Sequence, residues 1–140
     1  MGLDIGDRRI GVALSDTLGI LATPFTIIER RDEKQDISVI IEIIDQNQVG
    51  MIIAGLPLVI DGGIGQQAAK VKAFVEILAR RTQVPIEFRD ESLTTVEARR
   101  IMLTSRSKKN RQRSRDDDVA AAVLLQAYLE ERRSTNEQSP

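Results

Sequence analysis

The chain has 140 residues, the size of one domain, and its 41% of hydrophobic residues is enough to bury a core. It contains no Cys and no His, which excludes disulfides, thiolate or imidazole zinc sites and acid–base catalysis by His. Any metal ion must therefore be bound by oxygen ligands, and water is the expected nucleophile.

The N-terminal third of the chain predicts three strands followed by a helix. Residues 2–6 and 9–15 are short apolar runs joined by a turn, which is the pattern of a β-hairpin. A third extended segment covers residues 21–29, and its Pro24 favours an edge or irregular strand. Isoleucines spaced at i, i+3, i+4 and i+7 then predict an amphipathic helix over residues 33–47.

The rest of the chain alternates between strands and helices. Residues 51–54 are a continuous apolar run, as in a strand buried on both faces of a parallel sheet. The elements expected after it are a loop over 55–65, a long helix, a strand at 85–89, a helix at 94–104, a basic loop at 105–115 and a helix at 116–133. We expect residues 1–133 to form a single α/β domain with a mixed sheet and helices on both faces, and residues 134–140 to be a disordered polar tail.

Acidic residues occur at three strand ends or helix starts that are far apart in the sequence. Asp4 interrupts the apolar first strand, the pair Asp90 and Glu91 closes the strand at 85–89, and three aspartates at 116–118 open the last helix. Each group alone has an ordinary explanation as a turn, an ion pair or a helix cap. Folding can also gather such positions into a cluster of oxygens, which is what Mg²⁺ requires. The residues alone leave open which member of each group would face a metal ion.

A basic segment lies beside these acidic positions, although the net charge of the whole chain is only −1. Residues 92–115 contain eight Lys or Arg and a single acidic residue, Glu97. Such a segment either contacts phosphates without reading sequence or is simply a solvated run of charge. Neither a signal peptide nor an apolar run of about 18 residues is visible, so we expect a cytoplasmic protein with no membrane partner.

Taken in order, four segments resemble the YqgF/RuvX family, a Holliday-junction-resolvase-like group whose members are assigned to pre-16S rRNA cleavage. The likeness covers residues 2–130, and four motifs in order are far more specific than any one of them. The segments are residues 2–13 with 15–16, residues 55–58 with 61–62, residues 90–95, and residues 117–121 followed by 125–126 and 128–129.

The resemblance implies an RNase H-like fold, with a five-stranded mixed sheet whose first three strands are antiparallel, flanked by helices. It implies cleavage of nucleic acid with Mg²⁺ or Mn²⁺ as cofactor, and it assigns catalysis and metal binding to Asp4, Glu91 and Asp117. Asp90 and Asp118 are the nearest substitutes for the last two. The expected partner is a structured nucleic acid, RNA rather than DNA, bound by a monomer or a homodimer. The residues expected to contact it are Arg8, Arg9, Arg106, Lys108, Lys109, Arg111, Arg113 and Arg115.

This sequence departs from the family pattern at two places. Ser92 stands where the third motif usually has Arg, so the role of that Arg passes to Arg89 or lapses. The first strand also starts a few residues late, which makes the central strand short.

The leading hypothesis is a metal-dependent endonuclease acting in 5′-end maturation of pre-16S rRNA, and hence in ribosome biogenesis. One alternative is a Holliday-junction resolvase on DNA, which is expected to act as a symmetric dimer. Another is a non-catalytic nucleic-acid-binding factor in transcription or ribosome assembly. Residues 4–6 also resemble the first phosphate loop of actin-like ATPases, but those proteins need two such domains and this chain has one.

Overall fold

The computed structural model describes residues 1–57, 65–90 and 116–138, and the expected helix at 94–104 and basic loop at 105–115 lie outside these residues. The strands are β1 (Gly2–Ile5), β2 (Arg9–Ser15), β3 (Ala22–Glu29), β4 (Ile52–Leu56) and β5 (Ile86–Asp90). The helices are α1 (Glu33–Asn47), α2 (Gln66–Arg81) and α5 (Asp116–Gln138).

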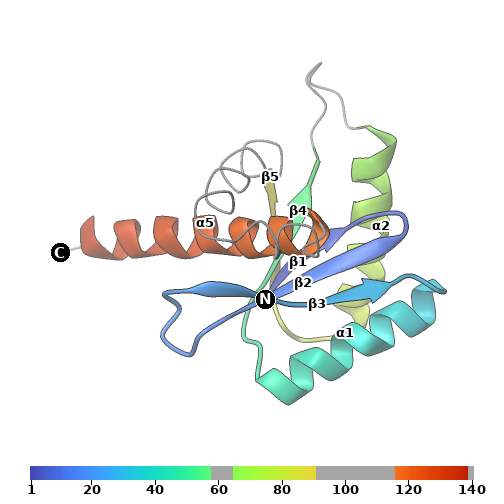
Figure 1. The fold of residues 1–140 in the computed structure, drawn as a ribbon, viewed down its shortest axis with the longest axis horizontal. Helices are drawn as coiled ribbons and strands as arrows, with labels where there is room; N and C mark the ends of the chain where they lie inside the picture. Colours follow the sequence, from blue (N-terminus) through green and yellow to red (C-terminus); the bar gives the residue numbers. More distant parts are fainter. Residues whose placement is uncertain (58–64, 91–115, 139–140) are drawn as a thin grey trace, which may run out of the picture.

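The five strands form one sheet in the order β3-β2-β1-β4-β5 (Figure 1). β1 pairs antiparallel with β2, and β2 pairs antiparallel with β3, whereas β4 is parallel to both β1 and β5. This confirms the mixed sheet with three leading antiparallel strands. The expectation from Pro24 is also confirmed, because β3 is an edge strand of the described sheet and its register with β2 shifts between Val12 and Ala13.

Helices α1 and α2 cover one face of the sheet. Leu3 and Ile5 of β1 are buried on this face with the apolar sides of both helices, including Ile40 of α1 and Phe74 of α2. Helix α1 begins after Asp32, whose side chain accepts a hydrogen bond of 2.8 Å from the backbone N–H of Gln35. The bounds of α1 in the structure are the ones predicted from the sequence, residues 33–47.

Helix α5 covers the opposite face and packs against β1, β2, β3 and β4 (Figure 1). It comes unusually close to β1 at Gly2, where a Cβ atom would lie 2.6 Å from the carbonyl oxygen of Ala121 and 3.0 Å from the Cβ of Leu125. Only glycine permits this approach. The side chain of Gln126 ties the same helix to the β2–β3 connection, because it accepts from the N–H of Ala22 (2.8 Å) and donates to the carbonyl of Ile20 (3.0 Å).

The end of α5 corrects one expectation. Residues 134–138 were expected to belong to a disordered polar tail, but the helix continues to Gln138. These residues include no Gly or Pro, and extending an existing helix adds one hydrogen bond for each residue that is fixed. A polar composition removes the reason to pack, but it does not by itself end a helix anchored upstream. Within the described part of the chain, no helix is both long and apolar enough to cross a membrane.

Candidate active site

Asp4 lies on the central strand of the sheet and on the face that α5 covers. Strand residues alternate between faces, so Asp4 shares the side of Gly2, which contacts α5, while Leu3 and Ile5 belong to the core under α1 and α2. The carboxylate is partly buried. It sits one residue before the end of β1, at the edge where the parallel strands β1, β4 and β5 all end. Ligands of open α/β sheets bind at such an edge.

Both strand neighbours of Asp4 are glycines. Asp4 is paired with Gly11 of β2, and because Leu3 is paired with Ala54 of β4, Gly55 is the next residue along at the level of Asp4. No side chain from an adjacent strand position therefore crowds the carboxylate on either side. The β1–β2 hairpin pairs residues 2 and 13, and this register places Gly11 opposite Asp4. The short turn between the two predicted strands is the local signal that could have given this register. The parallel register that places Gly55 there has no such local signal.

The first turn of α5 lies toward the same edge of the sheet. Gln126 accepts a hydrogen bond from Ala22, which pairs with Ser15 of β2 at a level beyond the amino end of β1. Ala121 lies over Gly2, the first residue of β1. Moving back along the helix from 126 to 121 therefore follows β1 toward its carboxyl end. The fold thus brings the helix start at 116–118 to the edge that carries Asp4. The side chain of Asp117 and all of Glu91 lie outside the described residues.

Asp90, the substitute for Glu91, lies on the other face of the sheet. It is paired with Leu56 of β4, and Leu56 packs against the core under α1 and α2. Directly paired strand residues point to the same side, so Asp90 faces away from the side of Asp4.

Arg89 lies on the α5 face, paired with Gly55 in the row that contains Asp4. Its guanidinium donates to the carboxylate of Glu131 in α5. Two strand spacings, about 10 Å, separate the backbones of Arg89 and Asp4. Arg89 is therefore engaged with α5 in this structure, and nothing in the described contacts gives it the role of the family Arg that Ser92 replaces.

Two of the residues expected to bind nucleic acid lie in the β1–β2 turn and at the start of β2. Arg8 is exposed, and Arg9 forms an ion pair of 3.2 Å with Glu29 of β3. An exposed pair of this kind is weak and leaves the guanidinium available to a phosphate. The other six expected contacts, from Arg106 to Arg115, lie outside the described residues.

The donor set fits a hard divalent cation. The described residues hold no group of three His, Cys, Asp or Glu that would bind a metal ion, since they include the side chain of only one expected ligand. That ligand, Asp4, is a carboxylate flanked by glycines, and the positions expected to join it are also carboxylates. Oxygen ligands of this kind suit Mg²⁺ or Mn²⁺.

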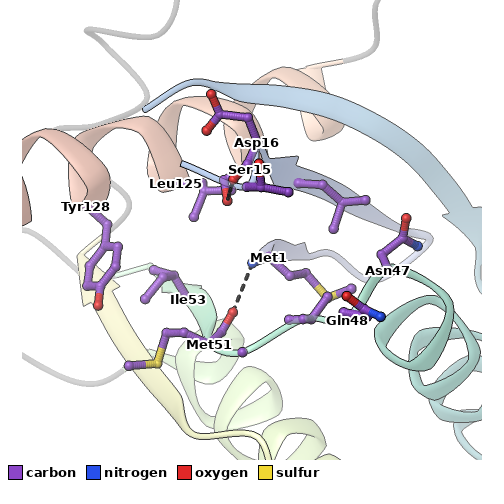
Figure 2. Close-up of a pocket in the computed structure, with 13 residues that line it drawn as sticks. Met1, Ser15, Asp16, Asn47, Gln48, Met51, Ile53, Leu125 and Tyr128 are labelled. Carbon is purple, nitrogen blue, oxygen red and sulfur yellow. Dashed lines mark hydrogen bonds between the residues drawn. The ribbon is translucent and has the colours of Figure 1, made fainter. Parts of the chain in front are cut away.

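A separate cavity lies at the other end of β1. A cavity of about 500 Å³ is lined by Met1, Asp16, Asn47 and Tyr128 among others, at the amino end of β1 (Figure 2). Within it the Met1 amine donates a hydrogen bond of 2.9 Å to the carbonyl of Met51. Since Asp4 is not among the lining residues, this cavity and the candidate site are separate.

The strand order, the helix faces and the acidic edge define the RNase H-like class, and solved structures agree. The chain is similar to T. thermophilus RuvC in complex with a Holliday junction substrate, with a TM-score of 0.61 and 13% identity, covering 96% of this chain and 94% of that one. It is similar to the Fowlpox virus resolvase bound to Holliday junction DNA, with a TM-score of 0.54 and 12% identity, covering 93% and 95%. At this identity the likeness establishes the fold.

The family is established by sequence. The family described as "RuvX: Holliday junction resolvase" matches residues 1–131, and the chain belongs to it. A relative from Desulforudis audaxviator is 44% identical over 134 residues, covering 96% of this chain and 95% of that protein. One from Dehalococcoides mccartyi is 46% identical over 127 residues, covering 91% and 94%. Both are named "Putative pre-16S rRNA nuclease". The chain is accordingly classed with the nucleases, which are hydrolases of phosphodiester bonds, as the sequence predicted.

Proposed function

We propose that this protein is a metal-dependent endonuclease that cleaves structured RNA in the 5′-end maturation of pre-16S rRNA. The observation that carries the proposal is the setting of Asp4, a carboxylate on the central strand between Gly11 and Gly55, at the sheet edge toward which α5 begins. The relatives named for pre-16S rRNA supply the substrate.

The metal ligands of this proposal are Asp4, Glu91 and Asp117. Glu91 is preferred to Asp90 because Asp90 shares the face of Leu56, opposite to Asp4. Asp117 is preferred to Asp118 on family register, and the start of α5 lies toward the sheet edge that carries Asp4. When bound to these carboxylates, Mg²⁺ or Mn²⁺ supplies activation of water and stabilises the charge that develops on the phosphate.

The basic residues hold the substrate in this scheme. Arg8 lies in the turn that follows β1, and Arg9 is the first residue of β2. Residues 106–115 add six positive charges for the phosphate backbone. Contacts of this type position a nucleic acid without reading its sequence, so recognition of the cleavage position must rest on the shape of the RNA.

A second candidate is resolution of DNA junctions by the same chemistry. The similarity of the fold to two resolvases whose structures contain Holliday junctions favours it. A resolvase acting on a two-fold substrate requires a symmetric dimer, whereas cleavage of a single RNA strand does not.

The test is a side-by-side cleavage assay on labelled precursor rRNA and on a four-way DNA junction, with Mg²⁺, Mn²⁺ or EDTA. Wild type is expected to cleave the RNA only with metal, and Asp4→Asn is expected to cleave neither substrate. Asp45→Asn is the matched control, since Asp45 is an exposed carboxylate on α1, on the opposite side of the sheet. Junction cleavage without RNA cleavage would favour the resolvase. Binding that survives both EDTA and Asp4→Asn, with no cleavage, would identify a non-catalytic factor.

A further inference from the structure

A buried ion pair lies directly behind the candidate site, on the other side of the sheet. Asp36 of α1 is only 2% exposed, and its Oδ2 accepts a hydrogen bond of 3.3 Å from Nε of Arg30. Its Oδ1 accepts from the backbone N–H of Arg31 at 3.1 Å. The Arg30 guanidinium also lies over the ring of Phe74, 5.0 Å from its centroid. This arrangement fixes the guanidinium in both position and orientation.

The second donor of that guanidinium reaches the chain just past Asp4. Nη1 of Arg30 donates to the carbonyl oxygen of Gly6 at 3.0 Å, and Gly6 is the first residue after β1. The preceding carbonyl, that of Ile5, accepts from Nε2 of Gln67 in α2 at 3.4 Å. Both carbonyls that follow Asp4 are therefore held by side chains from elsewhere in the fold.

The turn itself has little freedom to adjust if one of these hydrogen bonds is removed. The N–H of Gly6 donates to the carbonyl of Arg9 at 2.9 Å, and a Cβ on Gly6 would lie 2.9 Å from that same oxygen. Asp4 lies only two residues before this turn. A rotation of the Gly6 peptide would therefore be transmitted to the last residues of β1, which carry the carboxylate.

The geometry points to Arg30 as a positioning residue for Asp4, acting through the Gly6 carbonyl and held in place by Asp36. This inference rests on the proposed function, because it assigns Arg30 to the metal-binding carboxylate of that site. Arg30 touches neither metal nor substrate in this scheme. Its contribution is to keep the end of β1 in the one conformation that presents Asp4 to the other ligands.

Arg30→Lys separates this role from simple support of the fold. A lysine keeps the positive charge beside Asp36, which is what the buried carboxylate requires. It cannot reproduce the planar fork that contacts Asp36 and Gly6 at the same time. A purely structural role predicts at most a lower melting temperature for Arg30→Lys, with Mn²⁺ affinity and kcat as in wild type, whereas a positioning role predicts a loss of Mn²⁺ affinity and of kcat. Asp36→Asn is the second variant, because it removes the charge that orients Arg30 while keeping an acceptor for the N–H of Arg31.

The experiment measures Mn²⁺ affinity by paramagnetic broadening of backbone amides, kcat and KM on precursor rRNA, and the melting temperature. Arg30→Lys is expected to weaken Mn²⁺ binding and lower kcat about tenfold each, the effect typical of residues that orient metal ligands. The KM for RNA is expected to stay unchanged, and exchange of the Gly6 amide to become faster. The control is Arg81→Lys, an exposed arginine whose Nη1 donates to Ser38 at 3.2 Å between α2 and α1.

The outcomes separate the two proposals. Wild type that binds no Mn²⁺ near Asp4 and cleaves no RNA would refute the proposed function, and the role of Arg30 with it. Wild type that binds Mn²⁺ and cleaves RNA, with Arg30→Lys and Asp36→Asn matching it in Mn²⁺ affinity and kcat, would refute the role of Arg30 alone. A loss in melting temperature with no loss in metal affinity would also overturn it, because the ion pair would then only support the fold.

Discussion

The close approach between α5 and the sheet makes Gly2→Ala the most informative stability test of this fold. The new Cβ would lie 2.6 Å from the carbonyl oxygen of Ala121 and 3.0 Å from the Cβ of Leu125. Because the first atom belongs to the helix backbone, no side-chain rotation relieves the contact. The helix must instead move from 2.6 Å to at least the 3.4 Å of an ordinary contact.

The expected cost follows from overpacking of a close-packed interface. Such substitutions cost about 1–3 kcal/mol, and a clash with backbone on one side and a buried Leu on the other points to about 2 kcal/mol. For a domain of this size about 4 °C of melting temperature corresponds to 1 kcal/mol, so Gly2→Ala should melt about 8 °C below wild type. The displaced helix also carries Asp117, so metal affinity should fall together with stability.

The matched control is Gly50→Ala, since a Cβ on Gly50 would meet nothing within 4 Å. Its φ is not positive, so alanine fits there without strain. The substitution should stabilise the folded protein by about 0.4–1 kcal/mol, because alanine lowers the conformational entropy of the unfolded chain. Both variants are compared with wild type by thermal and urea unfolding monitored by circular dichroism. Equal melting temperatures for Gly2→Ala and Gly50→Ala would refute the close packing of α5 on β1.

Three further predictions concern the β2–β3 turn, the attachment of α5 to that turn, and the basic segment. The backbone N–H of Ile20, together with other turn amides, holds the pKa of Asp16 below its ordinary value, with a hydrogen bond of 2.7 Å. The Asp16 carboxylate therefore stabilises the fold above its unfolded pKa, and this stabilisation is lost as the pH falls through its folded pKa. Wild type should have a higher urea midpoint than Asp16→Asn at neutral pH, and the difference should disappear in strong acid. Gln126→Ala removes both hydrogen bonds to the turn and should cost about 1–3 kcal/mol in urea unfolding. Replacing the six basic residues of 106–115 by Gln should flatten the dependence of log K for RNA on log salt by about 0.7 for each phosphate that is no longer neutralised, and an unchanged slope would exclude that segment from the interface.

Local pattern is sufficient to predict most of the fold. The hairpin, the helix at 33–47 and the buried strand β4 all have short-range signals, namely alternation, isoleucine spacing and a continuous apolar run. The hairpin also fixes its own register, and Gly11 opposite Asp4 follows from it. The prediction of a disordered polar tail is wrong for residues 134–138 because composition reports on packing, whereas the helix to Gln138 depends on propagation from residues that are already packed.

The candidate site is predictable only in part, because it is assembled by long-range pairing. Nothing near Gly55 in the sequence shows that it lies beside Asp4, since the parallel register of β1 and β4 is set by the whole sheet. In the sequence the choice between Asp90 and Glu91 rests on family register, and the pairing of Asp90 with Leu56 gives a physical reason against Asp90. Arg30 and Asp36 give no signal at all, because an Arg between polar neighbours and an Asp in a helical first turn are ordinary until folding buries them.

The most direct test of the metal site is a crystal of this protein soaked with Mn²⁺ and measured for anomalous scattering. We expect at least one Mn²⁺ bound by Asp4 together with Glu91 and Asp117, at the carboxyl ends of β1, β4 and β5, and none in crystals of Asp4→Asn. An ion bound without Asp4, or full occupancy in the Asp4→Asn crystal, would contradict the proposed metal site.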